Sequence, residues 1–126
     1  ETYNTRSKKI YDQMWNTNEN KMNTIEKLIK ILYERKKESP KDSYTSSLLN
    51  EGVEICCKKL GEESSELIIA CMRDNKEEIK NESADLIYHL LVLLVSKKID
   101  FKDVLSILEG RMKMSGLEEK KNRKSN

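Results

Sequence analysis

Acidic side chains at helical spacing are the residues of this sequence best placed to do chemistry. They lie in two short segments, GEESSE at residues 61–66 and ESAD at residues 82–85. At 100° per residue, Glu63 and Glu66 lie about 60° apart on a helix, and Glu62 lies about 40° from Glu66 on its other side. The first segment therefore presents its carboxylates along one helical face.

The second segment repeats this arrangement, because Glu82, Asp85 and His89 fall within about 60° of one another on a helix. Asp74 and Asn75 supply a turn between the two segments. Helices joined by a short turn usually pack antiparallel, and the two acidic pairs lie at similar distances from this turn. We therefore expect the pairs to face each other across the groove between the helices.

Facing carboxylates repel one another when they are partly buried, and divalent cations remove this repulsion. Oxygen ligands without cysteine suit Mg²⁺ or Mn²⁺, and an ion held by few carboxylates keeps positions free for phosphate oxygens and water. The pattern indicates metal-assisted phosphoryl chemistry. The alternative is that the acids are solvated, since such pairs also occur by chance in a chain that is 37% charged.

A di-iron site is excluded by the residue three positions before the histidine. Di-iron bundles place a glutamate three residues before each histidine ligand, and residue 86, three before His89, is a leucine. His89 is then either a polar group at the edge of the core or a contact to substrate or to a metal ligand.

Helices must position these groups, and the composition favours helices. The 126 residues include one Pro and four Gly, with many Lys, Glu, Leu and Ile, which favours helix over sheet in a single domain. We predict an all-α bundle of about four helices, with bounds near residues 25–39, 46–73 and 76–96 and a short fourth helix capped by Asp100. Gly61 allows a bend or break in the second helix.

The predicted third helix is apolar on every side from Leu86 onward. Such a helix belongs at the centre of a bundle or at a subunit interface. A core of short helices is thin, so we expect a homodimer to complete it.

The predicted domain covers residues 23–112, and the segments on either side of it are polar. We predict that residues 1–22 are an N-terminal appendage, which is a tag, a remnant of a fusion or an extra helix. We expect residues 113–126 to form a basic, disordered tail that is solvated rather than bound to nucleic acid. The longest apolar run, residues 86–95, is about half the length that a bilayer requires, so we expect no membrane span. Three cysteines without paired metal-ligand spacing indicate reduced thiols and a cytoplasmic protein.

Three segments carry a family resemblance: SYTSSLL, KKLGEESSELIIA and ESADLIYHLLVLL. They resemble the phosphoribosyl-ATP pyrophosphatases of histidine biosynthesis, within the wider group of all-helical, MazG-like nucleoside triphosphate pyrophosphohydrolases. The wider group is defined by EExxE followed by ExxD. The narrower resemblance rests on ERKK at residues 34–37, on the SYT loop, and on KKLGEE and ADLIYHLLVLL, and it covers about residues 25–111.

The resemblance implies Mg²⁺-dependent hydrolysis of phosphoribosyl-ATP to phosphoribosyl-AMP and pyrophosphate. It implies that the metal ligands are Glu63, Glu66, Glu82 and Asp85. We assign catalysis to Glu62 and Glu63, with Glu62 either contacting a second metal ion or polarising the attacking water. The remaining phosphate groups require further partners, for which the candidates are Arg35, Lys36, Ser43, Tyr44, Thr45, Lys58, Lys59 and His89. For each lysine, a place on a solvated face is the alternative.

Two other functions fit the same residues. A pyrophosphohydrolase of ordinary or damaged nucleoside triphosphates would use the same metal site with a different base pocket. A non-catalytic helical dimerisation module would carry the acids on solvated faces and would bind no Mg²⁺.

Overall fold

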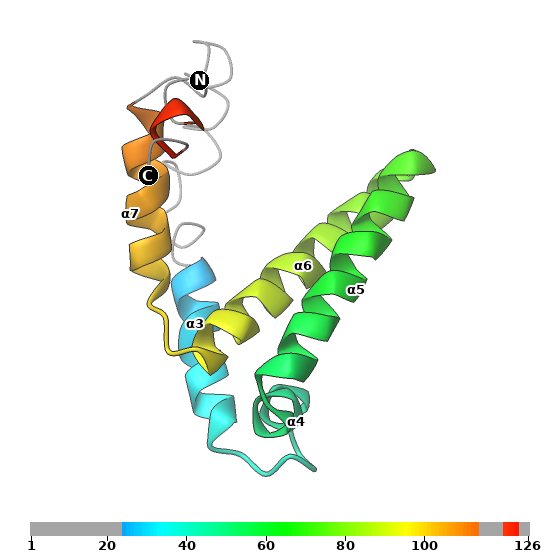
Figure 1. Ribbon diagram of the computed structural model, residues 1–126. Coiled ribbons are helices and arrows are strands. Elements are labelled where there is room, and N and C mark those ends of the chain that lie inside the picture. Colours follow the sequence, from blue (N-terminus) through cyan, green and yellow to red (C-terminus); the bar gives the residue numbers. More distant parts are fainter. Residues whose placement is uncertain (1–23, 114–119, 124–126) are drawn as a thin grey trace. The chain divides into compact units, whose positions relative to one another are not determined.

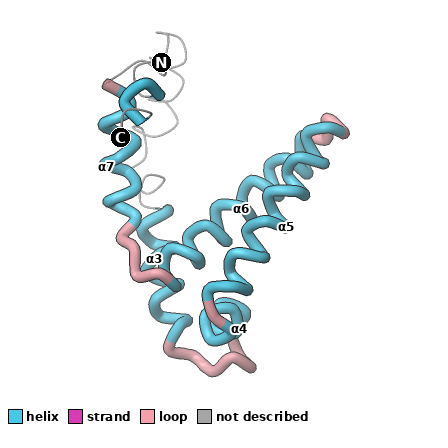
Figure 2. The backbone as a smooth tube through the Cα atoms, viewed as in Figure 1, coloured by secondary structure: helices cyan, strands magenta, loops and turns pink. Residues whose placement is uncertain are grey.

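The computed structural model describes residues 24–113 and 120–123, and these residues contain helices and no strand. The helices in order are α3 (Thr24–Lys36), α4 (Tyr44–Glu51), α5 (Val53–Met72), α6 (Lys76–Ser96) and α7 (Phe101–Met112). Figure 1 shows them as ribbons, and Figure 2 shows the loops that join them. The prediction of an all-α bundle is confirmed. No helix in the described ranges is long and apolar enough to cross a membrane.

The chain divides into two compact units. One unit is Lys27–Ile99, which contains every residue that the sequence nominated for a site. The helix α7 belongs to the other unit, so the predicted domain, residues 23–112, contributes to both. The predicted appendage, residues 1–22, lies outside the described residues, as does much of the predicted tail.

The antiparallel pair of α5 and α6 is the framework of the larger unit, and these two helices contact each other more extensively than any others described (Figure 1). The turn between them includes Asp74, whose φ of 53° lies in the left-handed region. Asn75 caps α6, because its side-chain oxygen accepts a hydrogen bond from the backbone N–H of Glu78 at 3.2 Å. The predicted turn and the predicted bounds of this helix are confirmed.

The predicted second helix is two helices, and the predicted bend at Gly61 was wrong. The chain breaks at Gly52, where φ is +102°, a backbone conformation that side chains with a Cβ rarely adopt. Gly61 lies inside α5, which continues through it without interruption. Glycine weakens a helix at either position, but only Gly52 has the backbone angle that requires glycine.

The SYT segment was predicted to be a loop, and the structure places Tyr44 and Thr45 in the first turn of α4. Ser43 is the N-cap, and its hydroxyl oxygen accepts a hydrogen bond from the backbone N–H of Ser46 at 3.1 Å. The Ser46 hydroxyl in turn donates to the carbonyl of Glu38 at 2.6 Å. These bonds fix the start of α4 against the loop that follows α3.

Most of the core of the larger unit lies at the end of the helix pair where α5 begins and α6 ends. Its buried apolar side chains come from α3, α4, both ends of α5 and the second half of α6: Leu32, Leu48, Cys56, Ala70, Leu91, Val92 and Val95. Towards the other end of the pair, apolar side chains are exposed, among them Ile68 with 61% and Met72 with 83% of their surface accessible. The larger unit therefore leaves part of the helix pair uncovered.

The helix α7 begins as the sequence predicted. The Asp100 carboxylate accepts a hydrogen bond from the backbone N–H of Lys102 at 2.9 Å, which satisfies a donor of the first turn. No side chain of α7 is buried.

Candidate active site

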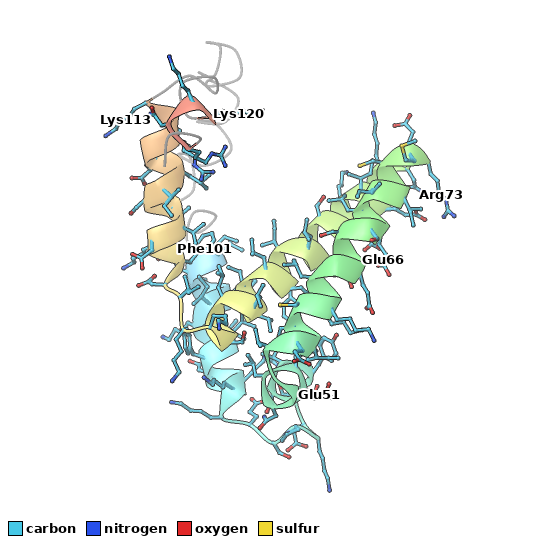
Figure 3. All side chains as sticks on the ribbon, viewed as in Figure 1. Glu51, Glu66, Arg73, Phe101, Lys113 and Lys120 are labelled. Carbon is cyan, nitrogen blue, oxygen red and sulfur yellow. The ribbon has the colours of Figure 1, made fainter. Side chains whose placement is uncertain are left out.

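Three carboxylates from two helices meet in the groove between α5 and α6. Glu63 and Glu66 come from α5 and Glu82 from α6, and one oxygen of each lies within 4.8 Å of the others. Figure 3 shows where Glu66 lies along α5. The antiparallel pairing and the spacing of three residues between Glu63 and Glu66 bring these groups together, as the sequence predicted. We call these three residues the acidic cluster.

Asp85 lies beside the acidic cluster rather than within it. Its side chain is exposed and is not among the oxygens that gather within 4.8 Å. Its negative charge nevertheless contributes to raising the pKa values of Glu63 and Glu82. The structure thus brings together three of the four predicted metal ligands and leaves the fourth within electrostatic reach.

The acidic cluster is electrostatically costly. Burial is the main cause that raises the pKa of Glu63 from 4.5 to about 7, and the neighbouring carboxyls of Glu82 and Glu66 contribute to the same rise. The pKa of Glu82 is also raised, first by its contact with Glu66 and then by burial. Like charges held close together in a partly buried groove favour the protonated form.

Two buried oxygens in the acidic cluster have no hydrogen-bond partner, one on Glu63 and one on Glu82. Buried polar atoms are normally paired, so unpaired carboxylate oxygens in a group of three acids require an explanation. A hard divalent cation satisfies such oxygens and cancels the repulsion, and Mg²⁺ is held by few carboxylates. The donor set therefore fits a Mg²⁺ or Mn²⁺ site.

Glu62 points to a different set of partners. Its carboxylate lies 3.2 Å from the Lys59 Nζ and 4.0 Å from the Lys58 Nζ. The hydrogen bond that the Lys59 Nζ donates to Glu62 is the main cause of the raised pKa of Lys59, and the charge of Glu63 adds to it. Lys59 therefore lies close enough to the acidic cluster for the negative charge of the cluster to affect its pKa.

His89 connects the acidic cluster to an aromatic group. It is buried, its Nε2 lies 3.8 Å from an oxygen of Glu63, and its Nδ1 has no partner. Burial is the main reason that its pKa is lowered, which favours the neutral imidazole. The rings of Tyr88 and Tyr44 meet the imidazole edge-on, with centroids 4.9 Å and 6.2 Å away.

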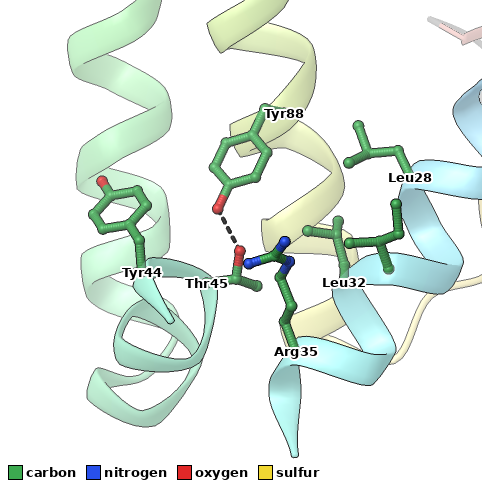
Figure 4. A pocket seen from close by; sticks show the side chains of 7 residues that line it. Leu28, Leu32, Arg35, Tyr44, Thr45 and Tyr88 are labelled. Atoms are coloured by element: carbon green, nitrogen blue, oxygen red, sulfur yellow. Dashed lines mark hydrogen bonds between the residues drawn. The ribbon is translucent and has the colours of Figure 1, made fainter. Parts of the chain in front are cut away.

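A pocket of about 380 Å³ lies beyond this aromatic group (Figure 4). The Tyr88 hydroxyl and the Thr45 hydroxyl share a hydrogen bond of 2.5 Å at its wall. The residues that line it come from α3, α4 and α6: Leu28, Ile31, Leu32, Arg35, Tyr44, Thr45 and Tyr88. We call this the Arg35 pocket. It joins Arg35, Tyr44 and Thr45, which the sequence nominated separately.

Other nominated residues have different places. Ser43 uses its hydroxyl as the cap of α4, and Lys36 is exposed at the end of α3, outside the residues that line the pocket. The sequence did not nominate Tyr88 as a site residue. It lies in an apolar stretch and looked like a core residue, although a tyrosine next to the polar His89 was a sign that this side of the helix meets polar groups.

Comparison with known proteins identifies relatives over most of the chain. Residues 25–112 match the family model described as phosphoribosyl-ATP pyrophosphohydrolase. Proteins named phosphoribosyl-ATP pyrophosphatase from Roseobacter denitrificans and Sinorhizobium medicae are 41% and 42% identical, over 79% and 81% of this chain and 95% of each relative.

A third relative is longer than this chain. The protein named histidine biosynthesis bifunctional protein HisIE from Bacillus subtilis is 47% identical over 71% of this chain and 42% of its own length. The match with the family model extends over α3 to α7, including the acidic cluster and the Arg35 pocket. The chain belongs to the phosphoribosyl-ATP pyrophosphohydrolase family of enzymes.

Proposed function

We propose that this enzyme hydrolyses phosphoribosyl-ATP to phosphoribosyl-AMP and pyrophosphate, the second step of histidine biosynthesis, with Mg²⁺ as its cofactor. Two relatives that it covers almost completely bear the name of this activity. The observation that carries the metal requirement is the acidic cluster, in which Glu63 and Glu82 each have a buried oxygen without a partner. Mn²⁺ would fit the same oxygens.

Glu63, Glu66 and Glu82 would hold the metal ion, with Asp85 beside them. A bound Mg²⁺ supplies positive charge for the triphosphate and lowers the pKa of a coordinated water. The residues of the chain contribute by bringing these carboxylates together from two helices before substrate arrives, so that little reorganisation is needed at the moment of reaction.

The roles proposed for Glu62 and Lys59 follow from their contact. Glu62 holds the Nζ of Lys59 at 3.2 Å, and Lys59 lies within the electrostatic reach of Glu63. A cation in this position would favour the negative charge of the departing pyrophosphate. Glu62 remains our candidate for polarising the attacking water, which would require it to release Lys59. Lys58 makes the longer contact to Glu62 and supports the same arrangement.

His89 would position Glu63 rather than carry charge. Its burial lowers its pKa and favours the neutral form, in which one ring nitrogen donates and the other accepts. The Nε2 lies on the side of Glu63, so a neutral imidazole there would restrict the rotation of that carboxylate without competing as a cation. A preorganised ligand loses less side-chain entropy when it binds a metal ion.

We further propose that the chain works as a homodimer in the cytoplasm. Five large apolar side chains are exposed on the helix pair: Val53, Ile68, Ile69, Met72 and Ile87. Four of them follow the acids along the same helices, with Ile68, Ile69 and Met72 after Glu66 and Ile87 after Asp85, and a second copy would shield them from water. A dimer would also exclude water from the neighbouring acidic cluster, which strengthens its electrostatic interactions.

The test is pyrophosphate release from phosphoribosyl-ATP, with and without Mg²⁺, with ATP and dUTP as comparison substrates. We expect release from phosphoribosyl-ATP only, and only with the metal. Glu66→Gln should lower kcat by roughly 100-fold or more, whereas Glu54→Gln, an exposed acid on the same helix, should leave it unchanged.

Each of the unexpected results would overturn a different part of the proposed function. Release chiefly from ATP or dUTP would keep the chemistry and overturn the proposed substrate. Full activity of the Glu66→Gln variant would overturn the proposed metal site. Release from none of the three substrates would make a non-catalytic helical module the better interpretation.

A further inference from the structure

The Arg35 pocket offers a positive charge on the far side of His89 from the acidic cluster. We propose that this pocket binds the phosphate monoester on the second ribose of the substrate, and that Tyr88 is a specificity-determining residue there. This inference rests on the proposed function, because an ordinary nucleoside triphosphate carries no such second phosphate.

Arg35 is the charged group of the pocket and is available to a ligand. It lies in the last turn of α3, is exposed, and forms no ion pair with any residue in the described ranges. Figure 4 shows its guanidinium beside the hydroxyls of Thr45 and Tyr88. A planar guanidinium binds phosphate oxygens with two parallel hydrogen bonds, which an ammonium group cannot do.

The two hydroxyls supply a further donor. Thr45 and Tyr88 share one hydrogen bond, so one of their two protons is used between them and the other remains free. Thr45 is also the second residue of α4, and the first N–H groups of a helix have no acceptor within it. An anion bound at this hydroxyl would lie near the positive end of the helix dipole.

The rest of the pocket is apolar. Leu28, Ile31 and Leu32 form the wall contributed by α3, and Leu32 is buried. Apolar walls reduce the water around a bound anion, so each charged contact counts for more than it would on an open surface. A single guanidinium, a free hydroxyl proton and an apolar wall fit one compact anion such as a phosphate monoester.

Consecutive residues of α6 connect the pocket to the acidic cluster. Tyr88 lines the pocket, and His89 lies 3.8 Å from Glu63. The two side chains also contact each other, with ring centroids 4.9 Å apart. A ligand that spans both places needs phosphate groups on both sides of its nucleoside, which phosphoribosyl-ATP has and ATP lacks.

The experiment compares two ligands that differ only in the phosphorylated ribose. Titration calorimetry in EDTA measures the Kd of the wild type for phosphoribosyl-AMP and for AMP, so neither metal nor hydrolysis is needed. We expect phosphoribosyl-AMP to bind at least about tenfold more tightly, the effect of one charge-assisted hydrogen bond or more. Arg35→Gln should abolish this preference, and Tyr88→Phe, which keeps the ring, should reduce it several-fold.

Matched controls separate the pocket from general effects. Lys30→Gln removes another exposed positive charge from α3, and Tyr33→Phe removes another tyrosine hydroxyl from the same helix; neither residue lines the pocket. Both variants should retain the preference of the wild type for phosphoribosyl-AMP. Circular dichroism of each variant establishes that it is folded.

The outcomes distinguish failure of this inference from failure of the proposed function. If the wild type binds the two ligands equally or binds neither, or if Arg35→Gln keeps the preference, the pocket assignment is overturned even when phosphoribosyl-ATP is hydrolysed. If the preference depends on Arg35 but no pyrophosphate is released from phosphoribosyl-ATP, the pocket assignment stands and the proposed reaction fails.

Discussion

The substitution Glu63→Gln should stabilise the metal-free protein, and its advantage over the wild type should grow as the pH rises from about 4.5 to about 7. In the folded chain the pKa of Glu63 is raised from 4.5 to about 7, mainly by burial and then by Glu82 and Glu66. Between these two values the folded state binds a proton that the unfolded state has released. The contribution of Glu63 to stability is therefore full below about pH 4.5 and is lost as the pH rises through about 7.

The size of the effect follows from the same values. A difference of about 2.5 pKa units corresponds to about 3 kcal/mol of stability lost between pH 4.5 and pH 8. One pairwise repulsion in the acidic cluster is of the same order, since two unit charges 4.8 Å apart interact with about 3.5 kcal/mol at an effective dielectric constant of 20. Glutamine has nearly the same shape as glutamate and carries no charge, so it avoids this cost.

The assay is urea unfolding followed by circular dichroism, in EDTA, at pH 5 and pH 8. Because the unfolded state begins to release its proton near pH 4.5, part of the loss has already occurred at pH 5. The unfolding free energy of Glu63→Gln, relative to that of the wild type, should therefore be larger by about 2.5 kcal/mol at pH 8 than at pH 5. Because the comparison is between two proteins at each pH, the titration of groups outside the acidic cluster largely cancels. Glu54→Gln, an exposed acid in the first turn of α5, serves as the control and should follow the wild type.

A pH-independent difference between Glu63→Gln and the wild type would refute this reasoning, because it would mean that Glu63 does not titrate abnormally. Mg²⁺ provides a second comparison. Saturation at about 100 times Kd stabilises the binding-competent protein by about 2.7 kcal/mol. We expect this gain in the wild type at pH 8 and little of it in the variant.

Four further substitutions test the fold and the assembly by urea unfolding and light scattering. Gly52→Ala should destabilise the protein by about 1 kcal/mol or more, because of the φ of +102°, whereas Gly61→Ala should stabilise it by about 0.5–1 kcal/mol; equal effects would contradict the assignment of the break. Ser43→Ala should cost about 1 kcal/mol through loss of the α4 cap, and an unchanged midpoint would count against that cap. Ile68→Asp should shift the protein to monomer, and a persistent dimer would place the interface elsewhere.

The helix pair was predictable from the sequence because its signals are local. Asn75 follows a turn residue and caps α6, and three-residue spacing fixes the angle between Glu63 and Glu66 on any helix. The break was not predictable in the same way. Gly52 and Gly61 both lie in an apolar-periodic stretch, and the sequence does not reveal which of them has positive φ, since that depends on how α4 packs onto α5 and α6.

The parts of the site that the sequence missed depend on contacts between distant segments. Glu62 is an exception, because its partner Lys59 lies three residues earlier on the same helix and the pairing follows from helical spacing alone. The hydroxyl of Tyr88 finds its partner in Thr45, 43 residues earlier in the chain. A tyrosine in an apolar helix looks like a core residue until the helix that supplies its polar partner is placed.

The distribution of buried residues along α6 explains how the fold tolerates the acidic cluster. The second half of the helix anchors the core through Leu91, Val92 and Val95, all nearly inaccessible to water. Each such side chain contributes roughly 1.5–3 kcal/mol when fully buried. Together they exceed the cost of about 3 kcal/mol that we calculate for Glu63. On α6, Glu82 lies about two and a half turns before Leu91, the nearest of these three residues. Repulsion in the acidic cluster therefore acts on the groove without unfolding the core, and a bound cation would relieve that repulsion.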